Sequence, residues 1–471
     1  MNKSFNDFEL HSQLKQAIAG LGYTEPTPIQ AQTLPVLLAN ARTHFHGQAQ
    51  TGTGKTLAFG LPLLQHIDPA IKKVQGLVIA PTRELAVQIE QSLTSLARSL
   101  GIFVVPIYGG VPIEKQMRDL RNGAHIVVGT PGRLNDHIKR KTLRLDGTKI
   151  VILDEADIML DMGFKEEVDE LINATAYDRS LWLFSATVKS CINDLMKSHM
   201  PNPVSVRVNA TSVASDNTKQ YYAIANRRQR FEVLCRIIES VEDLYGFVFC
   251  QTKMMTAEVA QMLEKRGYKA QALNGDMSQA RRNQVIKSFK NKEFNLLIAT
   301  DVAARGLDVP DITHVINYGL PEDQESYIHR IGRTGRAGKQ GVAITLVDPY
   351  QQFRLNSLSR RYRISIDPIS LPTAEEMMQK QVRKAQESLE QLSKQSFNRS
   401  HEQELAKIIN QLSHEELVRA LVACTSKLFM NVSTEEFSQE SFSAAQRGEE
   451  GRRQQGGNRP RGRSRFFSRR R

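Results

Sequence analysis

The sequence has few cysteines and no long apolar run. Its four cysteines, Cys191, Cys235, Cys250 and Cys424, show no C-x-x-C pairing and no histidine at metal-ligand spacing. This pattern argues against structural zinc and disulfides and is typical of a reduced, cytoplasmic protein. No stretch approaches the roughly 18 apolar residues that cross a membrane, and the polar N-terminus does not resemble a signal peptide. We therefore expect a cytoplasmic protein that has no membrane partner.

Acidic residues are outnumbered by basic ones, but the basic excess is unevenly distributed. The formal net charge is +13. Residues 446–471 contain ten Arg and two Glu, a net charge of +8, which leaves +5 for the rest of the chain. The body is therefore nearly balanced, and the basic tail is a separate device that favours a polyanion partner. The low-complexity composition of residues 441–471 predicts a disordered Arg/Gly-rich tail.

Short apolar runs alternate with helical patterns through the first 350 residues, which is typical of parallel sheets covered by helices on both faces. The first series is GLVIAPT, FVVPIYGG, AHIVVGTP, KIVILDEAD and SLWLFSAT, and the second is GFVFCQT, NLLIATD, HVINYG and VAITLVD. A small, polar stretch at 208–217 separates the two series and reads as a linker. The pattern predicts one α/β domain over residues 1–207 and a second over 218–365.

Beyond Asp367 the strand patterns stop and helical patterns begin, which predicts a helical extension over residues 366–440. One helix opens with a capping box from Thr373 to Glu376, and another opens at Ser413 with Glu416. The first carries a heptad-like seam of Met378, Val382, Ala385, Leu389 and Leu392, and a helix from Ser400 carries Leu405, Ile408, Ile409 and Leu412. Such stripes pack within a chain more often than they form a dimer, and both options stay open.

The stretch AQTGTGKT matches the P-loop pattern, except that Ala49 replaces the first glycine. Its glycines allow backbone N–H groups to surround phosphate oxygens, Lys55 reaches the terminal phosphates, and the Thr56 hydroxyl coordinates Mg²⁺. A helical pattern follows, so the positive end of a helix faces the anion. The candidate phosphate-binding residues are Ala49, Gln50, Thr51, Gly52, Thr53, Gly54, Lys55 and Thr56.

Three carboxylates crowd the end of the apolar run at 150–153. Asp154, Glu155 and Asp157 repel one another and resist burial, so we expect a cation among them. A strand that ends in Asp-Glu beside a P-loop is the Walker B arrangement, in which Asp154 holds Mg²⁺ and Glu155 polarises the attacking water.

Eight motifs occur in the order found in DEAD-box RNA helicases of superfamily 2. They are GYTEPTPIQ, AQTGTGKT, PTRELA, TPGR, DEAD, SAT, TDVAARGLD and HRIGRTGR, and the resemblance covers roughly residues 5–365. It implies two tandem RecA-like parallel-sheet domains and an RNA-stimulated ATPase with RNA helicase activity. ATP and Mg²⁺ are the implied cofactors, and RNA is the implied partner.

The resemblance also implies contacts to the nucleotide. Gln30 has an amide donor and acceptor that match the adenine edge, which favours ATP over GTP. Phe5 occupies the place of the family's upstream aromatic, and Tyr23 adds a second ring nearby. Asp308 resembles the family's contact to the ATP ribose. Arg333 and Arg336 resemble arginine fingers, which stabilise charge on the γ-phosphate and complete the catalytic set with Lys55, Asp154 and Glu155.

The SAT motif resembles the element that couples ATP hydrolysis to strand separation. We expect the hydroxyls of Ser185 and Thr187 to hydrogen-bond Asp157 and His329, which ties the metal site to the second domain. The following VKS stretch lacks the proline usual in the family, and we expect this difference to be harmless.

Candidate RNA contacts are dispersed over both predicted domains. Their hydroxyls, backbone N–H groups and guanidinium groups suit phosphates and 2′-hydroxyls, so little sequence preference is expected. They are Thr82, Arg83, Gly109, Gly110, Thr130, Gly132, Arg133, Gln279, Arg282, Thr300, Asp301 and Arg305. The resemblance implies that ATP and RNA together close the two domains on a bent single strand. The basic tail, with Phe466 and Phe467 as candidate stacking residues, reads as a non-specific RNA tether.

Two other functions compete with an RNA helicase. One is a DNA translocase of the same superfamily, and the other is an RNA-annealing chaperone whose ATP cycle only times release. The extension resembles segments that dimerise some bacterial DEAD-box proteins, so a homodimer through residues 373–430 is one option. Backbone contacts do not identify the RNA, so ribosome assembly, mRNA decay and cold adaptation, with their partner proteins, all remain open.

Overall fold

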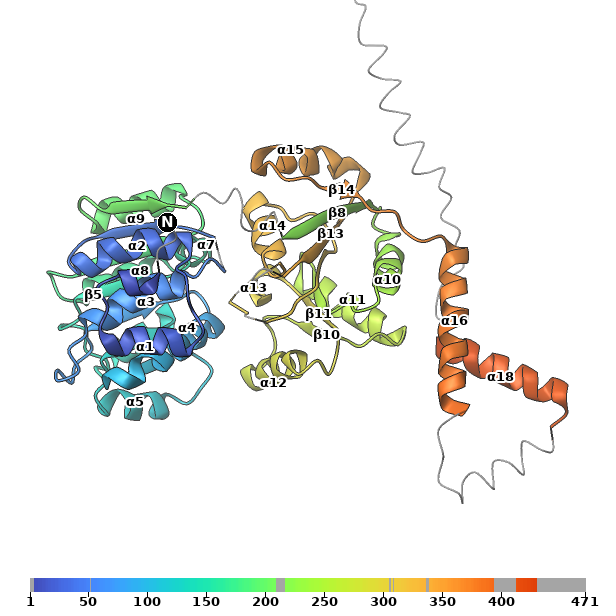
Figure 1. The fold of residues 1–471 in the computed structure, drawn as a ribbon, viewed down its shortest axis with the longest axis horizontal. Helices are drawn as coiled ribbons and strands as arrows, with labels where there is room; N and C mark the ends of the chain where they lie inside the picture. The colour runs from blue at the N-terminus through green and yellow to red at the C-terminus, as the bar shows by residue number, and fades with distance from the viewer. Residues whose placement is uncertain are drawn as a thin grey trace, which may run out of the picture.

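The computed structural model describes residues 4–50, 52–208, 217–304, 306–307, 309–335, 339–393 and 412–429. These residues form two α/β units, in blue to green and in green to orange in Figure 1, and two further helices beyond them. Most of the predicted linker, the helix expected from Ser400, and the Arg-rich tail with Phe466 and Phe467 lie outside the described residues.

The first unit is built on a seven-stranded, all-parallel sheet with the order β3-β4-β2-β5-β6-β1-β7. The strands are β1 (Phe45–Gln48), β2 (Gly76–Ile79), β3 (Val104–Ile107), β4 (Ile126–Gly129), β5 (Ile150–Leu153), β6 (Ser180–Ser185) and β7 (Val204–Arg207). The five apolar runs of the first series coincide with β2 to β6. The short, polar β1 was not expected, and it has no room for a side chain at Gly47, where a Cβ would lie 2.8 Å from the Phe184 ring.

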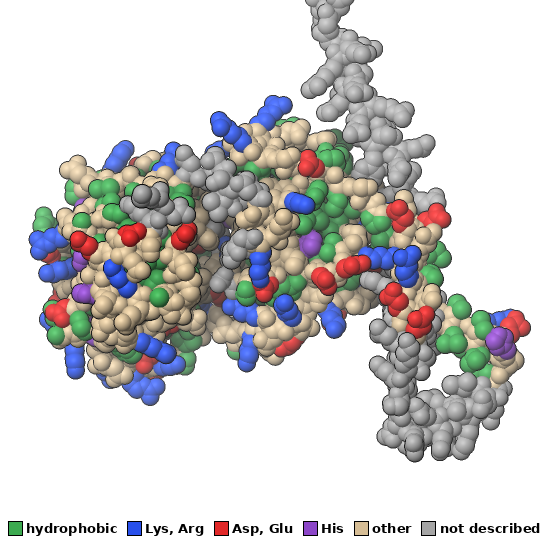
Figure 2. Space-filling view, in the orientation of Figure 1, with side chains coloured by type: hydrophobic (Ala, Val, Ile, Leu, Met, Phe, Trp, Pro, Cys, Tyr) green, Lys and Arg blue, Asp and Glu red, His purple; other side chains and the backbone are tan. Residues whose placement is uncertain are grey.

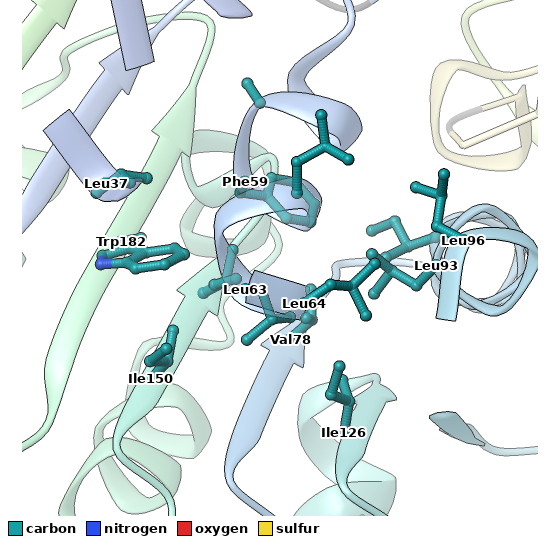
Figure 3. Close-up of a cluster of buried hydrophobic side chains, with 14 of the residues drawn as sticks. Leu37, Phe59, Leu63, Leu64, Val78, Leu93, Leu96, Ile126, Ile150 and Trp182 are labelled. Carbon is teal, nitrogen blue, oxygen red and sulfur yellow. The ribbon is translucent and has the colours of Figure 1, made fainter. Parts of the chain in front are cut away.

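Helices cover both faces of this sheet. They are η1 (Phe5–Asp7), α1 (Ser12–Gly20), α2 (Pro28–Ala39), α3 (Lys55–His66), α4 (Arg83–Ala97), η2 (Arg98–Leu100), α5 (Ile113–Arg121), α6 (Pro131–Lys139), α7 (Ala156–Asp161), α8 (Lys165–Asn173) and α9 (Ser190–His199). Figure 3 shows one core, in which Phe59 and Leu63 of α3 and Leu93 of α4 meet Trp182 and Val78 of the sheet. Alternate strand residues, such as Leu77 and Val151, enter the core on the other face. Each such side chain stabilises the fold by about 1.5–3 kcal/mol.

The second unit repeats the first. Its sheet is also parallel, with the order β10-β11-β9-β12-β13-β8-β14, which is the order of the first sheet when each is numbered from its own first strand. The strands are β8 (Thr218–Ile224), β9 (Gly246–Phe249), β10 (Ala270–Leu273), β11 (Leu296–Ala299), β12 (His314–Asn317), β13 (Gly341–Val347) and β14 (Asp367–Pro368). The helices are α10 (Arg230–Ser240), α11 (Lys253–Lys265), α12 (Gln279–Lys290), α13 (Asp301–Ala304), α14 (Gln324–Ile331), η3 (Pro349–Gln351) and α15 (Gln352–Tyr362). The predicted pair of tandem RecA-like domains is confirmed.

The extension contains α16 (Ala374–Ser393) and α18 (His414–Phe429). Both predicted capping boxes are present: the Thr373 hydroxyl accepts from the Glu376 N–H at 3.2 Å, and the Ser413 hydroxyl accepts from the Glu416 N–H at 3.3 Å. In each box the glutamate side chain accepts in return from the backbone N–H of the capping residue. Among the described residues, no helix combines the length and the apolarity that crossing a membrane requires.

α16 packs on the second domain through a residue beside its predicted apolar seam. Met377, just outside the predicted seam, is 2% exposed, and Lys380 donates to the backbone carbonyl of Glu239 at 2.8 Å, so α16 packs on α10. Met378 and Val382, which belong to the seam, remain 57% and 46% exposed. These two seam residues therefore do not pack within the chain, since the helix turns the neighbouring Met377 toward α10. Figure 2 shows apolar side chains at the surface of α18 also, where Val418, Leu421 and Val422 are exposed.

Candidate active site between the two domains

The P-loop connects β1 to α3, and its backbone depends on glycine. Gly52 and Gly54 have φ of 81° and 88°, in the left-handed region that favours glycine. Gly54 is the N-cap of α3, and a Cβ there would lie 2.4 Å from Gln30 Nε2. The turn therefore presents the N-terminus of a buried helix, with Lys55 as its first residue, to the end of the sheet. Thr53 closes the turn by donating to the Gln50 carbonyl at 2.7 Å.

Lys55 and the two acids that follow β5 form a buried cluster. Lys55 Nζ lies 3.9 Å from Asp154 Oδ1, and both side chains are almost inaccessible. Among the described residues, Lys55 Nζ and Glu155 Oε2 have no hydrogen-bond partner, although both atoms are buried. A buried ammonium and a buried carboxylate oxygen without partners are costly unless a ligand satisfies them. The cluster is therefore built to receive an anionic group with a proton donor beside it.

Burial raises the pKa of both acids, and Lys55 opposes the shift for each. At Glu155 the charges of Arg333 and His329 oppose it as well. Because a carboxylate with a raised pKa accepts a proton more readily, Glu155 is suited to act as a general base. The described residues contain no group of three or more His, Cys, Asp or Glu side chains that could hold a metal by themselves. Mg²⁺ does not need one, since it usually takes one or two protein ligands beside phosphates and water.

The backbone at Glu155 is strained. Glu155 has φ 50° and ψ 47°, a left-handed conformation that costs a residue with a side chain about 1–3 kcal/mol. It is the N-cap of α7, so the chain turns sharply at the point where β5 ends. The turn is held by the Glu155 N–H, which donates to Asp154 Oδ1 at 2.9 Å. The strained turn thus places Glu155 at the carboxyl end of β5, the central strand of the sheet.

The residues predicted to hold adenine lie in three environments. Gln30 is 3% exposed, and its amide group accepts from the Thr27 N–H at 2.9 Å and donates to the Gly54 carbonyl at 3.0 Å. Gln30 thus links the start of α2 to the P-loop. Phe5 is 4% exposed within the hydrophobic core, whereas Tyr23 is 49% exposed.

Asp157 holds the segment after β6. Its Oδ2 accepts from the Ala186 N–H at 3.1 Å, the Thr187 N–H at 2.9 Å and the Thr187 hydroxyl at 2.9 Å. Thr187 therefore lies where the sequence predicts. Ser185 instead pairs with His46 Nε2 at 3.3 Å, because β1 is the sheet neighbour of β6.

His329 and Arg333 bring the second domain to this cluster. Both Asp157 and Glu155 act on the pKa of His329, which burial lowers overall. Arg333 is 7% exposed and donates to the Leu307 carbonyl at 3.1 Å. They line a hollow together with Phe249, Asp301, Ala304, Ser326 and Arg330. The predicted site residues Thr51, Arg305, Asp308 and Arg336 lie outside the described residues.

Several predicted RNA contacts meet across the two domains. Arg83 Nη1 donates to Gln279 Oε1 at 2.7 Å, and Arg282 Nε lies 2.5 Å from Glu84 Oε1. Close backbone approaches accompany these contacts. A Cβ on Gly110 would lie 2.2 Å from Arg83 Nη1, and one on Gly306 would lie 2.4 Å from Thr82 Oγ1. These residues are therefore at the surface where α4 of the first domain faces α12 and α13 of the second.

Other predicted RNA contacts have structural partners. Asp301 pairs with Arg330 through two bonds of 2.5 and 2.7 Å, and the Thr300 hydroxyl accepts from the Ala303 N–H at 3.3 Å. Arg133 donates to the Val111 carbonyl at 3.1 Å. The other members lie as follows: Thr82 caps α4, Thr130 is the N-cap of α6, Gly109 lies against Arg83, and Gly132 is exposed with open space around it.

Sequence reasoning missed His46, Glu84, Lys189 and Glu325. Each contacts a partner from a distant part of the chain, at Ser185, Arg282, Glu325 and Lys189 respectively. Two of them adjoin recognised motifs, since Glu84 lies within PTRELA and Lys189 follows SAT. That position is the only sequence signal that pointed to them.

Two family models match the chain. Residues 27–195 match the model described as DEAD/DEAH box helicase, and residues 229–338 match the model described as helicase conserved C-terminal domain. These segments contain the P-loop and acid cluster on one side, and His329 and Arg333 on the other.

Relatives cover most of the chain. DEAD-box ATP-dependent RNA helicase CshA of Bacillus licheniformis is 44% identical over 381 residues, which is 81% of this chain and 78% of that protein. ATP-dependent RNA helicase CshA of Limosilactobacillus reuteri is 41% identical over 418 residues, 89% and 84% of the two chains. Among solved structures, S. cerevisiae Dbp5 bound to RNA and ADP BeF3 has a TM-score of 0.72 at 32% identity, covering 78% of this chain and 95% of that chain.

Proposed function

This chain belongs to the DEAD-box ATP-dependent RNA helicases, which hydrolyse ATP with RNA stimulation, and from that premise we propose how it works. It separates short RNA duplexes locally, or remodels RNA–protein complexes, by ATP-driven closure of its two domains on single-stranded RNA. The observation that carries this proposal is the buried Lys55, Asp154 and Glu155 cluster, on which charges from both domains act.

In the proposed site the P-loop holds ATP. The N-terminus of α3 and Lys55 bind the phosphates, and the unpartnered Lys55 Nζ supports this role. Gln30 recognises adenine near Phe5 and Tyr23. Its hydrogen bond to the Gly54 carbonyl connects the adenine site to the P-loop. Asp308 contacts the ribose. Thr56 and Asp154 would hold Mg²⁺, whose charge would offset that of the phosphates.

Hydrolysis is assigned to residues from both domains. Glu155 accepts a proton from the attacking water, since its Oε2 is buried without a partner and its pKa is raised by burial. Arg333 and Arg336 of the second domain stabilise the charge that develops on the γ-phosphate. Asp157 links the acid cluster to the SAT segment and, through its charge, to His329.

RNA binds across the two domains in this proposal. The Arg83 and Gln279 contact, and the close approach of Gly306 to Thr82, support an RNA surface that is complete only when the domains meet. The solved Dbp5 structure that this chain resembles is bound to RNA and ADP BeF3, which supports simultaneous binding. Because each ligand then favours the closed state, each tightens binding of the other. Backbone contacts leave the RNA sequence unspecified.

The test is the Glu155→Gln variant. Loss of a general base lowers a rate by about 10²–10⁴-fold, so RNA-stimulated ATP hydrolysis should fall by at least about 100-fold. Binding of ATP and single-stranded RNA should persist, because the substitution keeps the size of the side chain. An unchanged rate would remove Glu155 from the role of general base. Two measurements on the wild type separate an RNA helicase from a DNA translocase. One is the unwinding of a blunt RNA duplex, and the other is the stimulation of ATP hydrolysis by RNA compared with DNA.

The extension supports a second level of the proposal. Apolar residues of α16 and α18, among them Val382 and Leu421, are exposed, as a homodimer through residues 373–430 would require. Sedimentation of the intact chain tests the dimer. Ribosome-assembly or mRNA-decay proteins are the partners we propose for the chain.

A further inference from the structure

Lys189 lies in the VKS stretch, where the family usually has a proline, and its side chain spans the two domains. Its Nζ lies 2.7 Å from Asp161 Oδ2 at the end of α7 and 2.9 Å from Glu325 Oε2 in the first turn of α14. Asp161 belongs to the first domain and Glu325 to the second. A single cation thus holds one carboxylate from each domain.

The pair is partly shielded from water. The side chains of Lys189 and Glu325 are 34% and 24% exposed. Burial alone would lower the pKa of Lys189, but hydrogen bonds with Asp161 and Glu325 outweigh it and raise the pKa. Lys189 therefore stays charged throughout the physiological range. Because Asp161 already holds Lys189 within the first domain, less side-chain entropy remains to be lost when Glu325 arrives.

Both ends of this contact adjoin the coupling residues. Lys189 follows Thr187, which bonds Asp157 at 2.9 Å, by two positions. Glu325 and His329 are four residues apart on α14 and so share one face of the helix. The contact between Glu325 and Lys189 therefore orients α14 so that the face carrying His329 is turned toward Asp157.

We propose that Lys189 is a positioning residue that fastens α14 to the SAT segment in the closed arrangement, a role that rests on the proposed function. Without nucleotide and RNA the domains separate, and Lys189 keeps only Asp161. On closure Glu325 completes the contact. The pair thus contributes to the tightening of RNA binding by ATP, and not to RNA binding by itself.

The test measures the affinity of the full chain for a 20-nucleotide poly(U) RNA, with and without a non-hydrolysable ATP analogue. The ratio of the two affinities is the coupling. In Lys189→Gln and in Glu325→Gln the coupling should fall by about three- to five-fold. In the double variant the coupling should fall no further than in either single variant, because each substitution removes the same interaction. RNA affinity without nucleotide should change by less than about two-fold.

Two more variants sharpen the test. Lys189 has φ −80°, close to the value that proline requires, so Lys189→Pro should fold while removing the ammonium group. It should lose the same coupling as Lys189→Gln. The matched control is Lys139→Gln, which breaks the exposed Lys139–Glu170 pair of 3.7 Å within the first domain and should leave the coupling unchanged.

Several results would overturn the assignment. They are an additive loss in the double variant, an equal loss of RNA affinity with and without nucleotide, or an unchanged coupling in Glu325→Gln. If Lys189 variants do not fold, Glu325→Gln on the other domain decides alone. If the ATP analogue does not raise the RNA affinity of the wild type, the proposed closure itself is refuted. Tightening in the wild type that persists in every variant would refute only the role of Lys189.

Discussion

At the scale of the residue, the three carboxylates of the DEAD stretch differ because their neighbours differ. Asp154 lies beside Lys55, and Asp157 accepts three hydrogen bonds from residues 186 and 187. Glu155 keeps a buried oxygen without a partner among the described residues. A functional site at these acids was predictable from the sequence, because several acids at the end of an apolar strand are unusual. The left-handed backbone of Glu155 was not, since nothing in the local pattern requires it.

The environment of Glu155 predicts a trade of stability for activity. Burial raises its pKa, so the folded state disfavours the charged form. Glu155→Gln removes that charge and should raise the Tm of the ligand-free chain by about 2–4 °C, equivalent to about 1 kcal/mol. The gain should be absent below the ordinary pKa of 4.5 and grow as the pH rises toward the raised pKa, because only the unfolded wild type ionises in that window. Thermal unfolding between pH 4.5 and 8 measures it.

Asp154→Asn is the matched control for this prediction. It also removes one buried charge, but it leaves Lys55 buried without its nearby carboxylate. Burial raises the pKa of Asp154 as well, so its charge is also a cost, but removing it breaks the buried pair with Lys55 from one side. This variant should therefore gain less in Tm than Glu155→Gln. If Glu155→Gln lowered the Tm, burial of its charge would not be a cost to the fold.

At the scale of the element, strands were predicted where both faces are buried. β2, β4 and β5 are fully buried runs of apolar residues, and the sequence shows them as such. The strands that were missed have other patterns. β1 includes His46 and Gly47, and β7 lies exposed at the edge of its sheet. β1 and β7 are strands because they pair with neighbouring strands of the sheet. Such pairing produces no periodic apolar pattern in the sequence.

The capping boxes of α16 and α18 were predictable because they are local, whereas the rotation of α16 about its axis was not. The buried Met377 and the exposed Met378 make this rotation testable. Met377→Ala should lower the free energy of unfolding of the second domain by about 2–4 kcal/mol, as expected for a buried methionine. Met378→Ala should change it by less than about 0.5 kcal/mol. Urea unfolding of the two variants measures the difference, and equal effects would show that α16 does not dock on α10 through Met377.

At the scale of the whole molecule, two sheets of one strand order place their equivalent ends toward a shared site. The order of motifs predicted two such domains, because each motif follows a strand or starts a helix. The approach of His329 and Arg333 to the acid cluster was expected from the motifs, but other side-chain pairs between the domains were not predictable. Arg83 meets Gln279, and Lys189 meets Glu325, across more than 100 positions of sequence, and no local pattern pairs the members of either contact. Only the arrangement of the domains brings them together.

At the same scale, the basic residues of 446–471 carry +8 of the net charge of +13, and their proposed role as an RNA tether can be tested by removing them. A chain that ends at residue 445 loses ten Arg. Each phosphate contact on a single strand contributes about 0.7 to the slope of log affinity against log salt. The shortened chain should therefore bind RNA more weakly at low salt and with a shallower slope, while ATP hydrolysis at saturating RNA stays unchanged.

Replacing the ten arginines with lysine is the control for this truncation, and it should keep the slope, because counterion release depends on charge and not on the guanidinium group. Annealing of complementary strands, measured on the same proteins, decides between the two RNA functions. If annealing is lost with the tail while RNA-stimulated ATP hydrolysis survives, the tail carries the annealing and the two domains carry the helicase cycle. If the slope does not change on truncation, the tail does not contact RNA, and the excess of basic residues at this end of the chain serves another partner.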